Sequence, residues 1–416
     1  MPDPDASTPR LQRRLGLADA VVIGAGSMIG AGVFAAWSPA ATAAGGALLL
    51  GLLVAGLVAM CNATSSAQLA AIHPESGGTY VYGREQLGPA WGHLAGWGFV
   101  VGKTASCAAM ALTVGAYLWP AQTRLVGVAA VVVIVMVNLQ GITRTAAITR
   151  VLLAVSLLAI AAVVVAGWTV PDASITAIDV SGATPYQVLQ AGGLLFFAFA
   201  GYARIATMGE EVRDPSVTIP KAIPRALLGV LALYAVVGLT ALAAVGADVL
   251  AGSAAPLARV VEASNLSALR PVVGIGAGIA ALGVLLNLLA GVSRTMLAMA
   301  RRGELPAVLA RIDARRSVPH VAELVEGLIV IVLVMTIDLR GAIGLSGVAV
   351  LTYYAITNAA ALTLTSQQRR WPRAVAVLGL IGCVAMALSL PPTALGIGAV
   401  VLGLGVVVRL LSRPGR

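Results

Sequence analysis

Long apolar stretches constrain the fold of this chain more than any other feature of its sequence. A transmembrane helix needs about 20 consecutive apolar residues, and stretches of that kind recur along all 416 residues. Hydrophobic residues make up 59% of the chain and charged residues 11%, whereas soluble domains carry about 25% charged residues. The sequence therefore predicts an all-α polytopic membrane protein and excludes a soluble enzyme and an ordinary nucleic-acid-binding protein.

Uninterrupted apolar runs predict twelve transmembrane helices in a single transmembrane domain that covers residues 1–416. The first six helices are predicted at residues 17–40, 46–72, 91–119, 126–139, 147–170 and 188–208. The second six are predicted at residues 222–245, 271–294, 321–337, 342–364, 374–390 and 393–411. Because the fourth run is short, we expect its helix to begin inside the preceding loop.

The basic balance of the chain, with 27 Lys and Arg against 17 Asp and Glu, is explained by topology. With both termini cytoplasmic, 21 of the 27 basic residues lie in cytoplasmic segments and four lie in outer loops. Lysine and arginine concentrate in the cytoplasmic loops of membrane proteins. The sequence thus predicts a multi-pass protein of the cell membrane with cytoplasmic termini, surrounded by the lipid bilayer and with no nucleic-acid partner.

Candidate catalytic and metal-binding groups are sparse in the sequence. All three cysteines fall in predicted spans, which is typical of core packing: Cys61, Cys107 and Cys383. The three histidines lie in or near loops without metal-ligand spacing, so we interpret them as solvated: His73, His93 and His320. We therefore predict no metal, no cofactor and no catalytic residue, which disfavours an intramembrane enzyme.

Two of the predicted helices contain glycine where a helix is least able to tolerate it. The first has Gly24, Gly26, Gly30 and Gly32 within nine residues, and the sixth has Gly201 at its middle. Each glycine costs a helix about 1 kcal/mol relative to alanine, which favours unwinding. Breaks in helices one and six predict a five-plus-five inverted repeat with a substrate site between its halves. The alternative is that these glycines form a helix-packing surface.

Five segments along the chain carry a resemblance to a known family. They are residues 28–34 (MIGAGVF), 74–80 (PESGGTY), 138–141 (NLQG), 196–215 (FFAFAGYARIATMGEEVRDP) and 299–306 (MARRGELP). Together and in this order they resemble the amino acid–polyamine–organocation superfamily, and in particular its branch that is similar to cationic amino acid transporters.

The resemblance implies the leucine-transporter fold. Its first repeat would cover residues 17–170, its second repeat residues 188–364, and helices eleven and twelve residues 374–411. It also implies a secondary active amino-acid permease, either proton-coupled or an exchanger, that works by alternating access.

The same resemblance implies where an amino acid would bind. Backbone N–H groups of helix one would take the substrate carboxylate: Gly30, Ala31 and Gly32. Carbonyl groups would take the substrate amine: Met28, Phe197, Ala198 and Ala200. Ile29 and Gly201 lie within the two breaks, and Tyr202 with Phe199 either closes the site or packs in the core. Gly32→Val is predicted to abolish substrate binding and to leave folding near wild type.

Two basic residues lie inside predicted spans, Lys103 in the third and Arg204 in the sixth. A charge at the bilayer centre costs ~2.5–3.5 kcal/mol on insertion scales. Burial disfavours the charged form of Lys103, which makes it a candidate proton carrier or cation substitute; the alternative is a bond to helix carbonyls. Arg204 is open to the same two interpretations, with Glu210 as a structural partner. Many superfamily members carry a helix-five lysine at the position that Ser156 matches here.

The placement of acidic residues bears on the substrate. Those nearest the spans lie at span ends or in loops: Asp19, Glu210, Glu211, Glu323 and Glu326. We then expect no carboxylate deep enough to neutralise a cationic substrate beside Lys103 and Arg204. A neutral amino acid is favoured. The alternatives are a cationic amino acid or polyamine, or a membrane sensor or scaffold that no longer transports; the sequence leaves monomer and homodimer open.

Overall fold

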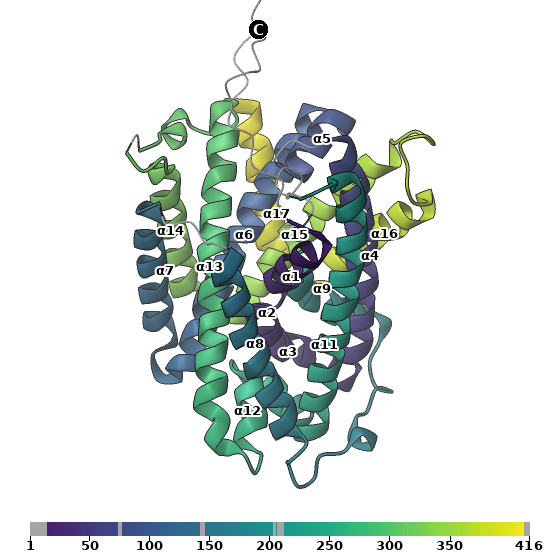
Figure 1. The fold of residues 1–416 in the computed structure, drawn as a ribbon, viewed down its shortest axis with the longest axis vertical. Helices are drawn as coiled ribbons and strands as arrows, with labels where there is room; N and C mark the ends of the chain where they lie inside the picture. The colour runs from purple at the N-terminus through teal and green to yellow at the C-terminus, as the bar shows by residue number, and fades with distance from the viewer. Residues whose placement is uncertain are drawn as a thin grey trace, which may run out of the picture.

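The computed structural model of the chain describes residues 15–73, 77–141, 146–202, 205, 212–313 and 315–411. Across these ranges the regular structure is helical, apart from two isolated β-bridges. Nine of the described helices are long and apolar enough to cross a membrane by length and composition. The chain is thus a bundle of apolar helices that lie mostly along one long axis (Figure 1).

Each predicted span overlaps a helix. The first six spans correspond to α1 (Leu17–Met28), α2 (Ala31–Ala35), α3 (Trp37–Ala44), α4 (Leu48–Ile72), α6 (Pro89–Leu118), α7 (Thr123–Leu139), α8 (Ala146–Gly167) and α9 (Pro185–Phe199). The others correspond to α11 (Pro215–Ala251), α13 (Arg270–Arg301), α14 (His320–Thr336), α15 (Leu339–Leu362), α16 (Arg373–Ser389) and α17 (Pro392–Leu411). As expected, α7 begins at Thr123, inside the predicted loop.

Two further helices occupy segments that the hydropathy pattern assigns to loops. Helix α5 (Thr79–Leu87) lies between α4 and α6, and α12 (Pro256–Glu262) lies between α11 and α13. Both are short, and α5 carries Arg84, Glu85 and Gln86 among its nine residues. A search for runs of about 20 apolar residues therefore passes over them.

The expected interruption of the first span lies at Ile29 and Gly30. Helix α1 ends at Met28 and α2 begins at Ala31, while Ile29 (φ −76°, ψ 75°) and Gly30 (φ −132°, ψ −149°) leave the helical region. The sixth span is interrupted in a similar way, because α9 ends at Phe199 and the chain turns at 200–202. Residues 203–204 and 206–211 lie outside the described part of the chain.

The helices that flank the two interruptions, α1, α2 and α9, lie near the centre of the bundle (Figure 1). Gly32, in α2, faces Ala198, in α9. Before the first break, the Ser27 carbonyl faces Gly201, which comes after the second break. Residue numbers rise along one segment and fall along the other in these two contacts, so the segments run antiparallel. Glycine lets the two backbones approach closely, which any side chain would prevent.

The remaining helices enclose this contact, with α6 and α15 most deeply buried. Small residues line their contact: Gly102 of α6 lies against Ala349 and Val350 of α15. A hydrogen bond of 2.8 Å between the hydroxyls of Ser106 and Ser346 joins the same two helices. In lipid there is little hydrophobic drive between helices, so such close packing and buried polar bonds hold them together.

The close approach at Gly32 predicts that its substitution harms folding. A Cβ atom at this position would lie 2.7 Å from the Ala198 Cα and 2.9 Å from its Cβ, and backbone cannot move aside cheaply. We expect Gly32→Ala to cost about 1–3 kcal/mol of stability, the usual range for overpacking, and to lower the melting temperature of the detergent-purified protein. The expectation that Gly32→Val would leave folding near wild type is therefore wrong.

The matched control is Gly229→Ala in α11, where an added Cβ meets nothing within 4 Å. Alanine is a better helix former than glycine by roughly 0.5–1 kcal/mol, so this variant should melt at the wild-type temperature or above. Equal melting temperatures for the Gly32→Ala protein and the wild type would contradict the close contact between α2 and α9.

Candidate functional site

The candidate site is the pair of helix breaks, where backbone carbonyls lose their helical partners. A hydroxyl from α11 reaches two of these carbonyls. Tyr234 Oη lies 2.7 Å from the Met28 carbonyl oxygen and 3.1 Å from that of Ala198. The hydroxyl has a single proton, which it donates to one carbonyl or shares between both, and in this position it links the two breaks. A buried carbonyl without a donor is costly, so Tyr234 stabilises the interrupted backbone.

The carbonyl of Ala200, at the second break, accepts from two further helices. The Lys103 ammonium of α6 lies 3.3 Å from it, and the Tyr354 hydroxyl of α15 lies 3.5 Å from it. Lys103 is only 8% exposed. Lys103, which the sequence analysis selects because a charge inside a span is costly, therefore lies at the break of α9. Its ammonium group points to a backbone carbonyl.

Aromatic rings pack around these bonds. Tyr202 stacks on Tyr354 with ring centroids 5.1 Å apart, and Phe199 meets Tyr234 edge-on at 5.2 Å. All four rings are buried, so the packing that the sequence analysis considered for Phe199 and Tyr202 is present. The sequence analysis missed Tyr234 and Tyr354. The signal that could have found them is a polar hydroxyl inside an apolar span.

The predicted site residues divide into those that the structure gathers and those that it does not. Met28, Ile29, Gly30, Gly32, Phe197, Ala198, Ala200, Gly201 and Tyr202 belong to the two breaks or their flanks. The backbone of Ala31 begins α2, although its side chain is not described. One predicted donor is engaged, since the Gly30 N–H donates to the Met28 carbonyl at 2.8 Å.

The other candidates lie elsewhere or outside the description. The hydroxyl of Ser156 donates to the Leu152 carbonyl of its own helix at 2.8 Å. Arg204, Glu210 and Glu211 lie outside the described residues, as do positions 74–76 of the PESGGTY segment. Among the described residues, no group of three His, Cys, Asp or Glu side chains is placed to hold a metal ion.

Two carboxyl groups lie deeper than the sequence predicts. Glu323 and Glu326 of α14 are 1% and 0% exposed, so both are buried among the helices although the sequence places them near the start of a predicted span. The amide of Asn138, in α7, donates to Glu323 at 2.6 Å, and the thiol of Cys107, in α6, lies 3.9 Å from Glu326. The two positions are three residues apart, so both point from one face of α14 into the bundle.

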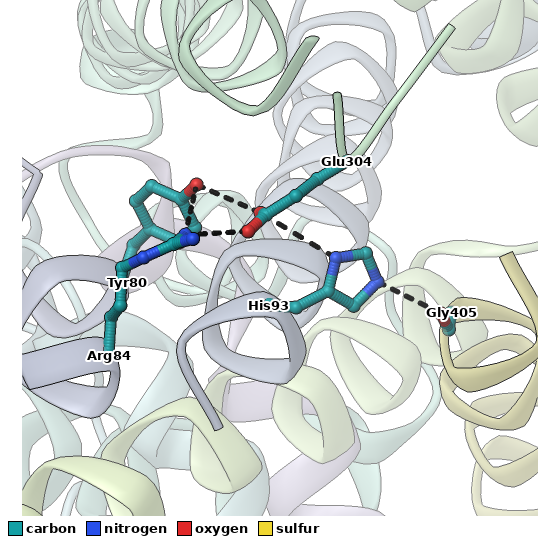
Figure 2. A network of polar contacts seen from close by, with 5 residues as sticks. All are labelled: Tyr80, Arg84, His93, Glu304 and Gly405. Carbon is teal, nitrogen blue, oxygen red and sulfur yellow. Dashed lines mark hydrogen bonds and ion pairs between the residues drawn. The ribbon is translucent and has the colours of Figure 1, made fainter. Parts of the chain in front are cut away.

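A second polar cluster surrounds Glu304, just beyond the end of α13 (Figure 2). Its carboxylate accepts from Arg84 at 2.6 Å and from the Tyr80 hydroxyl at 2.8 Å, both on α5. His93 Nδ1 lies 3.6 Å from the same carboxylate. His93 Nε2 lies 2.9 Å from the Gly405 carbonyl, and because a carbonyl can only accept, Nε2 carries a proton.

This cluster corrects one expectation and ties helix ends together. His93 is 1% exposed, so its interpretation as a solvated loop residue is wrong. Burial raises the pKa of the Glu304 carboxyl, but the bonds from His93, Tyr80 and Arg84 outweigh burial and hold that pKa below its usual range. The cluster joins α5, α6 and α17 to the end of α13.

Comparisons with known proteins find one matching family and several related transporters. The profile of the amino acid permease family matches residues 15–409. An uncharacterized transporter of Mycobacterium tuberculosis is 57% identical over 100% of this chain and 95% of its own length. The branched-chain amino acid permease BcaP of Bacillus subtilis is 24% identical over 88% of this chain and 83% of its own. Cationic amino acid transporter 7 of Arabidopsis thaliana is 26% identical over 85% of this chain and 66% of its own.

The Glu304 cluster predicts a pH-dependent contribution to stability. Glu304→Gln removes the negative charge that pairs with Arg84, so we expect a loss of about 1.5–3 kcal/mol at neutral pH, as for hydrogen bonds to charged groups. A carboxyl group whose pKa is lower in the folded than in the unfolded protein stabilises the fold at any pH above its unfolded pKa. That stabilisation is lost as the pH falls through the lowered pKa of the folded state. The melting temperatures of wild type and variant should therefore converge in acid.

The control is Glu85→Gln, which removes an exposed carboxylate from α5, the helix that carries Arg84 and Tyr80. Its melting temperature should follow that of the wild type at every pH. A constant difference between wild type and Glu304→Gln from neutral to acidic pH would contradict the ionic role assigned to Glu304.

Proposed function

The chain belongs to the amino acid permease family, and on that premise we propose that it is a secondary active transporter of neutral amino acids. The observation that carries the proposal is the contact between two helix breaks, where side chains donate hydrogen bonds to backbone carbonyls. Broken helices in corresponding positions are where secondary transporters bind their substrates. Alternating access would expose this contact to one side of the membrane and then to the other.

We propose the membrane topology on the same basis. Twelve spans form two inverted repeats, residues 17–170 and 188–364, followed by helices eleven and twelve at 374–411. The antiparallel contact between the two breaks supports the inversion, since Gly32 meets Ala198 and Ser27 meets Gly201. The excess of basic residues in one set of loops supports cytoplasmic termini in the cell membrane.

The substrate ammonium group is proposed to bind the carbonyls of Met28, Phe197, Ala198 and Ala200. In this structure the carbonyls of Met28, Ala198 and Ala200 accept hydrogen bonds from side chains. The donors are Tyr234, Lys103 and Tyr354. A substrate ammonium would compete with these donors for the same carbonyls, because buried carbonyls need a partner. The substrate carboxylate is proposed to bind the backbone N–H groups at the start of α2.

Lys103 supports a neutral substrate. Its ammonium group lies 3.3 Å from the Ala200 carbonyl, so a cationic substrate side chain would meet a like charge in a medium of low dielectric constant. Glu323 contacts Asn138, and Glu326 contacts Cys107. Within the described residues neither carboxyl group forms an ion pair with Lys103. The name of the Bacillus relative is consistent with a neutral substrate, and the Arabidopsis name keeps a cationic one as the alternative.

A screen of purified protein tests the substrate class. A ligand that binds the native state raises its stability, so leucine, isoleucine, alanine or serine should raise the melting temperature, and arginine, lysine and putrescine should not. Uptake into proteoliposomes should be inhibited by the same neutral amino acids. Inhibition by excess arginine or putrescine as strong as that by leucine would refute the proposal. Stabilisation without uptake would identify a sensor or scaffold.

Substitution of Lys103 tests whether its charge takes part in coupling. Lys103→Met keeps the length and removes the charge, so we expect a folded protein with reduced flux and an altered pH dependence. Lys103→Arg should also be impaired, because a guanidinium group stays protonated. The control is Lys221→Met, which removes the exposed second lysine of the chain. Wild-type flux at all pH values in Lys103→Met would exclude coupling through this residue, and rescue by Arg would make its role structural.

A further inference from the structure

Two buried carboxyl groups form a pair that is not part of the proposed substrate site. Glu323 and Glu326 lie one helical turn apart on α14 and are 1% and 0% exposed. Two carboxylates so placed repel each other, and each loses the water that would stabilise its charge. At least one of them is therefore stable only with a proton.

The hydrogen bonds show which carboxyl group holds this proton. Glu323 accepts a bond of 2.6 Å from the amide of Asn138, which stabilises a carboxylate. Glu326 has a thiol donor, Cys107, at 3.9 Å, and the backbone N–H of Ser293 in α13 faces its carboxyl group. Within the described residues, Glu326 Oε2 makes no hydrogen bond. A buried ionised oxygen without a partner costs far more free energy than a buried neutral hydroxyl without one, so the proton is assigned to Glu326.

Helix α6 connects this pair with the helix breaks. Cys107 lies four residues after Lys103, so both side chains are on one face of α6. The same thiol lies 3.9 Å from a carboxyl oxygen of Glu326. Lys103 in turn contacts the Ala200 carbonyl. The ionisable groups of α6 and α14 thus form a row that ends at the proposed ammonium site, with α7 contributing Asn138 and α13 the backbone of Ser293.

We propose that Glu326 is a proton-binding site that couples transport to a proton gradient; the proposal rests on the transport function proposed above. Binding forms an O–H bond at Oε2, and release breaks it, leaving the electron pair on the carboxylate while the proton passes to water that the opened transporter admits. Proton binding and release change the charge beside Cys107 of α6, the helix whose Lys103 contacts the Ala200 carbonyl. The proton and the substrate ammonium therefore act on the same helix break, which links their binding.

The proton itself is observed in the infrared spectrum of the detergent-purified protein. A protonated carboxyl group in the wild type should give a carbonyl band that disappears when alkaline pH removes the proton. Glu326→Gln should lack this band, and the exposed control Glu85→Gln should retain it. Glu323→Gln removes the neighbouring negative charge, so its band should disappear at a lower pH than that of the wild type. An unchanged band in Glu326→Gln would overturn the assignment.

Coupling is measured in proteoliposomes with radiolabelled leucine and alanine. Glu326→Gln is shaped like a protonated carboxyl, so it should retain exchange of internal for external amino acid. It should lose accumulation driven by an inward proton gradient, and Glu85→Gln should accumulate like the wild type. Proton-driven accumulation by Glu326→Gln at the wild-type level would overturn the proposal, as would accumulation by the wild type under a sodium gradient only.

A further variant covers the case in which glutamine impairs folding. Glu326→Asp keeps a carboxyl group one methylene shorter, so it should accumulate amino acid with a shifted pH dependence. Loss of both exchange and accumulation in Glu326→Asp and Glu326→Gln would make the residue structural and overturn the proposal. If the wild type moves neither amino acid, the proposed function fails for neutral substrates, while the infrared result on Glu326 stands by itself.

Discussion

The centre of this structure depends on side chains that donate hydrogen bonds to backbone carbonyls at two helix breaks. Met28, Ala198 and Ala200 are each held by a side chain from a different part of the chain, and the donors are Tyr234 and Lys103, with Tyr354 as a second donor to Ala200. In a bilayer no solvent water replaces such bonds. The breaks therefore persist only because α6, α11 and α15 surround them, and the same bonds mark where a substrate amine can compete.

The buried charges of the molecule have two different arrangements. The Glu304 carboxylate accepts hydrogen bonds from Arg84 and Tyr80 and lies 3.6 Å from His93 Nδ1, so its charge is compensated and it ties helix ends together. The row from Lys103 to Glu326 is poorly compensated, with one ammonium on a carbonyl and one carboxyl oxygen that makes no hydrogen bond to the part of the chain that the structure describes. Compensated charge favours a fixed structure, whereas poorly compensated charge changes its protonation when its surroundings change.

Much of the fold follows from local properties of the sequence. Spans are visible because bilayer thickness sets the length of each apolar run, and the break at Gly30 is visible because glycine is a poor helix former. Lys103 stands out because a charge inside a span is costly. These features need no knowledge of neighbours, which is why the helices and the first break could be predicted.

The tertiary structure decided what those features contact, because their partners are remote in sequence. Tyr234 lies 206 residues from Met28, and Arg84 lies 220 residues from Glu304. Hydropathy gives the length of a span but not which face points inward, so the burial of His93 and Glu326 could not be predicted from it. The sequence alone determined that the chain crosses a membrane with its first helix interrupted. Packing alone decided which side chains satisfy the interruptions, because a buried polar group takes the donors that the fold brings to it.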